Sequence, residues 1–185
     1  MRSLLVAISI LLSLCGCNKR GGSAEMRDAC ALLSKEDVQS VQAAPVNEAK
    51  NSRSSNGGLL VSQCFYTAAN FSKSVNLALV RNDPKQRNNG SPKDFWKEKF
   101  GPHAGGEKEP EDKSESKTAE KEEGPAPKTI SGLGDAAYWI PNRFGGVLYV
   151  LKGDAFISIG IGGTDDEETK LEKSKALAQK ALQRL

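Results

Sequence analysis

An apolar segment at the amino terminus decides which part of this chain can fold. Met1 and Arg2 stand just before residues 4–14, which carry no charge and include only two serines. This length matches the apolar region of a signal peptide, about 7 to 15 residues, and falls short of the about 20 residues that a membrane-spanning helix needs. The sequence therefore predicts that residues 1–16 form a signal peptide that is removed, and that only the remainder folds.

The end of this segment resembles the lipobox of bacterial lipoproteins, in which an aliphatic residue and two small residues precede a cysteine: Leu14, Cys15, Gly16 and Cys17. The resemblance implies cleavage before Cys17 and acylation of its sulfur, and two or more acyl chains hold a protein stably in a bilayer. Asn18 is not aspartate, which in this class implies the periplasmic side of the outer membrane if the organism has two membranes. The alternative is an ordinary secretory signal that leaves Cys17 as a free or paired thiol.

Two cysteines remain once Cys15 has left with the signal and Cys17 carries lipid. Cys30 and Cys64 then form an even pair in an oxidising compartment, where disulfides persist. A metal-binding or redox pair is the alternative, but the chain has no C-x-x-C motif and its single histidine is distant. The sequence therefore favours one structural disulfide.

The mature chain divides into a flexible tether at 17–26 and a single domain at 27–185 that a charged linker at 101–128 interrupts. The linker contains no large apolar residue, and eight acidic and four basic side chains lie between positions 107 and 123. Such a composition cannot bury enough surface to offset the entropy of ordering, so we expect disorder there. The formal net charge of the whole chain is +3, so the folded part is more basic than that figure suggests.

Capping patterns predict the helices. Ser34 followed by Asp37 resembles a helix-capping pattern, Ser91 and Pro92 open a second helix, and Thr164 followed by Glu167 opens a closing helix. The second helix is expected to direct three aromatic side chains to the core: Phe95, Trp96 and Phe100. The closing helix carries an apolar stripe of Leu171, Ala178, Ala181, Leu182 and Leu185.

Alternating apolar residues predict the strands, at 61–67, 74–81, 136–140, 147–151 and 155–161, with a polar loop at 50–58. Val75, Leu77 and Leu79 show the period of two that is typical of a half-buried strand. The element order predicts an α+β fold in which an antiparallel sheet of about five to six strands is packed by helices, with one disulfide.

Several short motifs resemble one group of small bacterial envelope lipoproteins. They are the early helix with Asp28, Cys30, Leu32 and Leu33, the strand Cys64-Phe65-Tyr66, the turn Gly132-Leu133-Gly134-Asp135-Ala136 and the hairpin at Gly153-Asp154. The resemblance covers most of residues 27–185 outside the linker. It implies an extracytoplasmic domain with a helix-to-sheet disulfide and supplies no activity.

Residues that could carry chemistry are few. The only histidine, His103, lies at the mouth of the charged linker where nothing orients it, so we expect no histidine-based catalysis and no zinc site. The acidic run 165–168 could bind calcium, but it also fits the first turn of a helix, where the helix dipole favours negative charge. Gly132 and Gly134 match only a fragment of a phosphate-binding motif and favour a turn. We expect no cofactor and no metal.

A basic cluster is the remaining candidate for a binding site. It consists of Arg81, Lys85, Arg87, Lys93, Lys97 and Lys99. Outside the cytoplasm such a cluster favours an anionic envelope lipid or polymer, or an envelope protein, over nucleic acid, while a merely solvated face is the simpler interpretation. The sequence thus favours a membrane-anchored, non-enzymatic binding, sensing or accessory module of the cell envelope. The alternatives are a glycan hydrolase built on two carboxylates and a structural component of an envelope complex.

Overall fold

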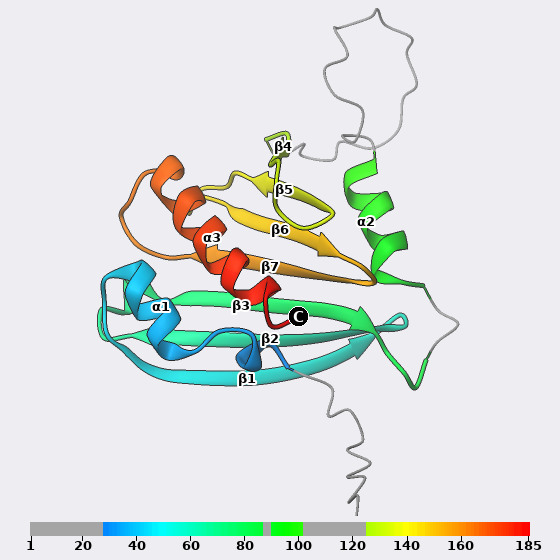
Figure 1. Cartoon of the computed structure of the whole chain (residues 1–185), viewed down its shortest axis with the longest axis horizontal. Coiled ribbons are helices and arrows are strands. Elements are labelled where there is room, and N and C mark those ends of the chain that lie inside the picture. Colours follow the sequence, from blue (N-terminus) through cyan, green and yellow to red (C-terminus); the bar gives the residue numbers. More distant parts are fainter. Residues whose placement is uncertain (1–27, 87–89, 102–124) are drawn as a thin grey trace, which may run out of the picture.

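A seven-stranded antiparallel sheet forms the centre of the computed structural model, which describes residues 28–86, 90–101 and 125–185 (Figure 1). The strands are β1 (Val46–Asn56), β2 (Leu59–Ala68), β3 (Val75–Asn82), β4 (Lys128–Thr129), β5 (Ala136–Ile140), β6 (Val147–Lys152) and β7 (Ala155–Ile161). Their order across the sheet is β1-β2-β3-β7-β6-β5-β4, so two meanders meet where β3 pairs with β7. The α+β class is confirmed, and the expected count of five to six strands is too low.

The predicted alternation of apolar residues sets the inner face of the central strands. Leu77 pairs with Ile159 and Leu79 pairs with Ile157, and all four side chains are buried. Because successive side chains of a strand point to opposite faces, these four side chains lie on the same face of the sheet. That face packs in the larger of the two hydrophobic cores.

Helices cover that face. They are η1 (Ala29–Ala31), α1 (Lys35–Gln42) and α3 (Glu167–Leu182), and Figure 1 shows α1 and α3 lying across the sheet. Ser34 and Asp37 make the predicted capping box of α1. The predicted start of α3 at Thr164 is wrong: Asp166 is the N-cap, because its carboxylate accepts a hydrogen bond from the Thr169 amide.

One further helix, α2 (Pro92–Phe100), packs on part of the opposite face, where Trp96 and Phe100 join Val80, Tyr138 and Phe156 in a second core. Ser91 caps α2 as predicted. The expectation that Phe95 also faces the core is only partly met. Its ring stacks on Phe156 with centroids 5.4 Å apart, but 38% of Phe95 remains exposed because it lies at the border of the packed side of the helix.

Two strands lie where the sequence predicts none. β1 takes in residues 50–56 of the expected polar loop at 50–58, and every residue of β1 after Val46 is exposed. β4 begins at Lys128, inside the predicted linker, and pairs with β5 through Trp139 and Tyr138. Both are edge strands, so pairing with a neighbour rather than an apolar pattern places them in the sheet. Of the predicted linker, residues 102–124 lie outside the described residues.

The turns gather at two opposite ends of the sheet. One end, here called the hairpin end, holds the β1–β2 turn at 57–58, the β6–β7 turn at 153–154 and the start of α2. The other, the loop end, holds η2 (Phe71–Lys73), the β5–β6 turn at 141–146 and the connection from β7 to α3. In Figure 1 the hairpin end is on the right and the loop end is on the left.

Candidate functional site

The predicted disulfide between Cys30 and Cys64 is present and joins η1 to β2, with the two Cα atoms 5.0 Å apart. Because both sulfur atoms are bonded to each other, the interpretation of these cysteines as metal ligands does not hold. Beside them the Ala29 amide donates a 2.9 Å hydrogen bond to Ser62 Oγ. The start of the described chain is therefore fixed to the middle of the sheet.

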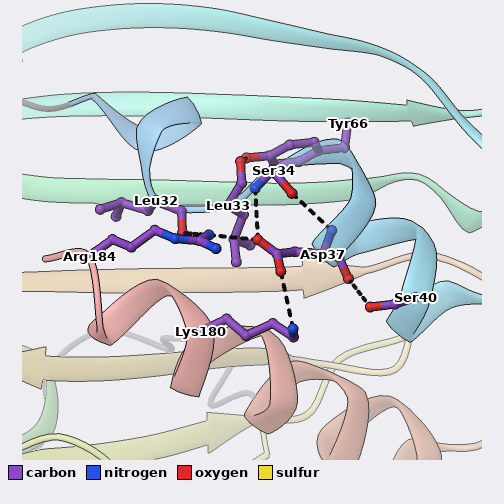
Figure 2. A network of polar contacts seen from close by, with 8 residues as sticks. All are labelled: Leu32, Leu33, Ser34, Asp37, Ser40, Tyr66, Lys180 and Arg184. Carbon is purple, nitrogen blue, oxygen red and sulfur yellow. Dashed lines mark hydrogen bonds and ion pairs between the residues drawn. The ribbon is translucent and has the colours of Figure 1, made fainter.

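Two other residues of the lipoprotein-like motifs serve the same attachment. Asp28 caps η1 and accepts hydrogen bonds from Asn51 Nδ2 at 2.8 Å and from Arg53 at 3.2 Å, both on β1. Tyr66 is fully buried and donates a 2.8 Å hydrogen bond to the carbonyl of Leu33, and burial raises the pKa of its phenol well above the usual range (Figure 2). These contacts show a structural role for both side chains.

The glycine-rich turn and the β6–β7 hairpin, which are 18 residues apart in the chain, meet through Asp135. Its carboxylate accepts a 2.7 Å hydrogen bond from the Gly153 amide, and its own amide donates to the Leu151 carbonyl at 2.8 Å. Gly134 has φ +64°, and a Cβ there would collide with the Leu151 carbonyl oxygen. The glycine therefore permits a close approach of two backbones, as the prediction of a turn requires.

A polar network around Asp37 fastens the carboxyl-terminal helix to the first one (Figure 2). Arg184 Nη1 lies 2.6 Å from Asp37 Oδ2 and 2.9 Å from the carbonyl of Leu32, and Lys180 Nζ lies 3.1 Å from Asp37 Oδ1. Burial alone would raise the pKa of Asp37, but hydrogen bonds from Arg184, the Ser34 amide and Lys180 outweigh it and hold the pKa well below its usual range. Asp37 therefore carries its charge as a structural anion.

The acidic run before and within the first turn of α3 behaves as the helix interpretation predicts. Asp165 pairs with Lys173 at 2.6 Å, Asp166 caps the helix, and Glu167 accepts from Lys128 at 2.6 Å. Glu167 also accepts a 3.0 Å hydrogen bond from the indole of Trp139. Within residues 28–86, 90–101 and 125–185, no group of three or more His, Cys, Asp and Glu side chains could hold a metal ion.

The residues of the predicted basic cluster do not all lie together in the structure. Arg81 lies at the end of β3 and Lys85 in the turn that follows, both at the hairpin end, while Arg87 lies outside the described residues. On α2, Lys93 and Lys97 are four residues apart and share one side of the helix.

Lys99 lies on the other side of α2, with its ammonium 5.4 Å from the ring centroid of Tyr149. The outward side between the lysines carries Asp94 and Glu98. The cations of α2 therefore do not form one continuous patch.

A hollow of about 450 Å³ at the hairpin end lies beside part of this cluster. Its lining residues are Arg81, Asn82, Lys152, Gly153, Asp154, Ala155 and Leu185. Lys93 reaches its rim, because its ammonium pairs with Asp154 at 3.1 Å. Two cationic side chains, one carboxylate and an apolar wall at Ala155 and Leu185 give a site suited to a ligand with an anionic group and an aliphatic part. We take this hairpin-end hollow as the candidate site.

A smaller hollow of about 220 Å³ next to α2 is lined by two carboxylate residues, Asp94 and Glu98. Asp94 accepts hydrogen bonds from the Ser91 amide at 3.1 Å and from Ser91 Oγ at 2.7 Å, so its carboxylate is engaged in the capping box of α2. This engagement does not favour the pair as the acid and base of a hydrolase.

Three large aromatic side chains are exposed among the described residues: Phe95, which the sequence predicts to face the core, and Phe71 and Phe144, which no sequence pattern singles out. Phe71 is 69% exposed and Phe144 is 68% exposed, both at the loop end. No alternation marks residues in short turns, so only the structure reveals them. Like Arg87, Cys17 and His103 lie outside the described residues.

Comparisons with known proteins found no match to any family model, curated protein or solved structure. Across the described part of the chain, the structure contains no helix that combines the length and apolar character needed to cross a membrane.

Proposed function

We propose that this chain is an extracytoplasmic lipoprotein of the bacterial cell envelope, held to a membrane by acyl chains on Cys17 and acting as a non-enzymatic binding, sensing or accessory module. The Cys30–Cys64 disulfide carries this proposal, because structural disulfides persist outside the cytoplasm and are rare inside it. The signal-like segment and lipobox at residues 1–17 agree with that compartment.

Differential alkylation of intact cells tests the compartment. Free thiols are blocked at once on lysis, disulfides are then reduced, and newly released thiols are labelled with a heavier reagent. The proposal expects Cys30 and Cys64 to carry the heavier label in almost every copy of the protein. Finding both cysteines blocked in the first step would contradict it.

The hairpin-end hollow is the proposed binding site, and its charges favour an anionic envelope component such as a phosphate-containing lipid headgroup or wall polymer. Arg81 and Lys152 line the hollow and Lys93 lies at its rim, and these three cations outnumber the two carboxylates that pair with the lysines, Asp135 with Lys152 at 3.3 Å and Asp154 with Lys93 at 3.1 Å. Two or more cations around a concave surface raise the local concentration of anions. A non-enzymatic role agrees with the engagement of Asp94 in the capping box of α2.

An NMR titration with glycerol 3-phosphate, a unit shared by phosphatidylglycerol headgroups and glycerol-phosphate polymers, tests this site. We expect the largest amide shifts at positions 81–82 and 152–155. Lys152→Gln should weaken the shifts several-fold, whereas Lys175→Gln on α3, whose partner is Glu172, should leave them unchanged. Shifts that are absent, or that are equally affected by both substitutions, would reject the site.

A further inference from the structure

We propose that the loop end of the sheet is a bilayer contact, in which Phe71 and Phe144 enter the interface of the membrane that carries the lipid anchor. This inference rests on the attachment through Cys17 proposed above. It concerns a different surface from the hairpin-end hollow. It assigns a partner, the lipid bilayer, to side chains that the fold leaves in solvent.

Exposure and position single out these two rings. Among the described residues, the large hydrophobic side chains that remain exposed are Phe71, Phe95 and Phe144. Phe95 lies on α2 near the hairpin end and still stacks on Phe156. Phe71 and Phe144 belong to different turns at the loop end, one after β2 and the other after β5. With strands about 4.8 Å apart, the two turns are separated by about 14 Å along that end.

The Phe144 ring has a cation against it, and a lysine follows Phe71 by two residues in the same short helix. The guanidinium of Arg143 lies 4.8 Å from the ring centroid of Phe144, and Lys73 ends the short helix that begins with Phe71. Long basic side chains next to aromatic rings suit a membrane interface, where the ring enters the boundary of the acyl chains and the charge stays with the phosphates. The neighbouring carboxylates are already engaged, Asp165 by Lys173 and Asp166 by the Thr169 amide.

The turn that carries Phe144 is held by internal bonds. The Phe144 amide donates to Asn142 Oδ1 at 2.8 Å, and its carbonyl accepts from Lys170 Nζ at 2.8 Å. Lys170 is only 5% exposed, so a nearly buried ammonium holds a turn whose aromatic side chain points to solvent. A Cβ at Gly146 would collide with the ring of Trp139, which shows how closely this turn is packed.

The turn that carries Phe71 is equally fixed. Asn70 caps η2 by accepting from the Ser72 amide at 3.2 Å, and Gln42 Nε2 donates to the Lys73 carbonyl at 2.7 Å. The turn lies so close to Gly162 that a Cβ on Gly162 would collide with the Ser72 carbonyl. Because both turns are already ordered, little conformational entropy is lost when the rings are buried in another phase.

The tether is long enough for this contact. Ten residues lie between Cys17 and Asp28, so the chain from Cys17 to Asp28 spans at most about 40 Å. Asp28 bonds to Asn51, five residues from the loop-end terminus of β1, a distance of about 17 Å along the strand. A bilayer contact at the loop end would turn the hairpin-end hollow away from the anchoring membrane, so that, of the ligands proposed for the hollow, a wall polymer could reach it and a headgroup of that membrane could not.

Tryptophan substitution and quenching by brominated phospholipids test the contact. The acylated full protein, as wild type or as Phe71→Trp, Phe144→Trp or Phe95→Trp, is reconstituted into phosphatidylethanolamine and phosphatidylglycerol vesicles with bromine on the acyl chains. We measure the fluorescence of each introduced tryptophan as the emission above that of the wild type. This fluorescence should be quenched by a larger fraction in Phe71→Trp and Phe144→Trp than in Phe95→Trp, which serves as the matched control at the other end of the sheet. Equal quenching of the three variants, or none above wild type, would overturn the inference.

The same variants separate this inference from the proposed anchor. If Cys17 is acylated and the protein stays on the vesicles without quenching at positions 71 and 144, the bilayer contact is wrong and the anchor stands. If Cys17 proves unmodified, the purified variants are added to vesicles from solution. Quenching at 71 and 144 then supports the contact without the anchor, and an absence of binding rejects both.

Discussion

Asp37 connects the first and last helices through one carboxylate. The Ser34 amide, Lys180 and Arg184 all donate to it, the last two from positions 143 and 147 residues later in the chain. The sequence predicts the hydrogen bonding between Ser34 and Asp37, since these residues have the spacing of a capping pattern. It does not predict the two distant cations, because nothing in the spacing of residues 180 and 184 indicates which carboxylate they approach. Local hydrogen bonds are visible in a sequence, and tertiary ion pairs are not.

Asp37→Asn should destabilise the fold in a pH-dependent way. The pKa of Asp37 is lowered in the folded chain, so its ionised form stabilises the fold fully above the unfolded-state pKa of about 4, and this contribution is lost as the pH falls through the lower folded-state pKa. We expect a loss of about 1 to 3 kcal/mol in the free energy of unfolding at pH 7, measured by urea denaturation. The difference from wild type should shrink between pH 4 and pH 2.

The matched control for Asp37 is Glu48→Gln on β1, where the side chain is exposed. This substitution should change the free energy of unfolding by less than about 0.5 kcal/mol, both at pH 7 and at pH 2. A loss in Asp37→Asn that stays constant from pH 7 to pH 2 would contradict the assigned role of the charge.

Gly134 and Gly132 offer a second paired test at the scale of single residues. Both have positive φ, +64° and +75°, but only a Cβ at Gly134 meets another backbone, whereas Gly132 has open space. We expect Gly132→Ala to cost about 1 kcal/mol for the left-handed conformation and Gly134→Ala to cost at least about 2 kcal/mol more, by thermal or urea denaturation. Equal losses would show that the close approach to Leu151 does not constrain the turn.

Among the elements, those with an apolar period were predictable and those without one were not. Val75, Leu77 and Leu79 predict β3 because burial of one face requires the period of two. β1 has no such period, since its residues after Val46 are exposed, and it is a strand because the tight turn at 57–58 pairs it with β2. β4 is held in the same way by β5. The seventh strand and the length of β1 therefore depend on pairing that composition does not show.

Helix α2 should depend on Phe100 far more than on Phe95. Phe100 is fully buried and stacks on Tyr138 with centroids 4.7 Å apart, whereas Phe95 is partly exposed. We expect Phe100→Ala to lower the free energy of unfolding by about 3 to 5 kcal/mol and Phe95→Ala to lower it by less than half of that amount. Equal effects, measured by chemical denaturation, would mean that α2 does not pack as described.

For the molecule as a whole, the disulfide links the predicted compartment to stability. It closes a loop of 34 residues between η1 and β2, for which the chain-entropy model assigns about 3 to 4 kcal/mol. The pairing was predictable because the sequence predicts that Cys15 leaves with the signal peptide and that Cys17 carries lipid, which leaves two cysteines to pair. The candidate hollow was not, because Arg81, Asp154 and Leu185 come from three separate segments that only the fold assembles.

Cys30→Ala/Cys64→Ala should therefore fold less stably than wild type by about 3 to 4 kcal/mol in urea under oxidising conditions. Reduction of the wild type should give a loss of similar size. Reduction of the double variant should change nothing, which separates the effect of the bond from that of the reductant. A double variant as stable as the oxidised wild type would show that the bond does not support the fold.

The state of Cys17 decides whether this chain is a lipoprotein, and intact mass spectrometry of the protein purified from membranes measures it directly. The predicted result is a chain that begins at residue 17, with added mass from acyl chains on Cys17 and with Cys30 and Cys64 two hydrogens short of the reduced form. A chain that retains residues 1–16, or that begins elsewhere with an unmodified Cys17, would contradict it.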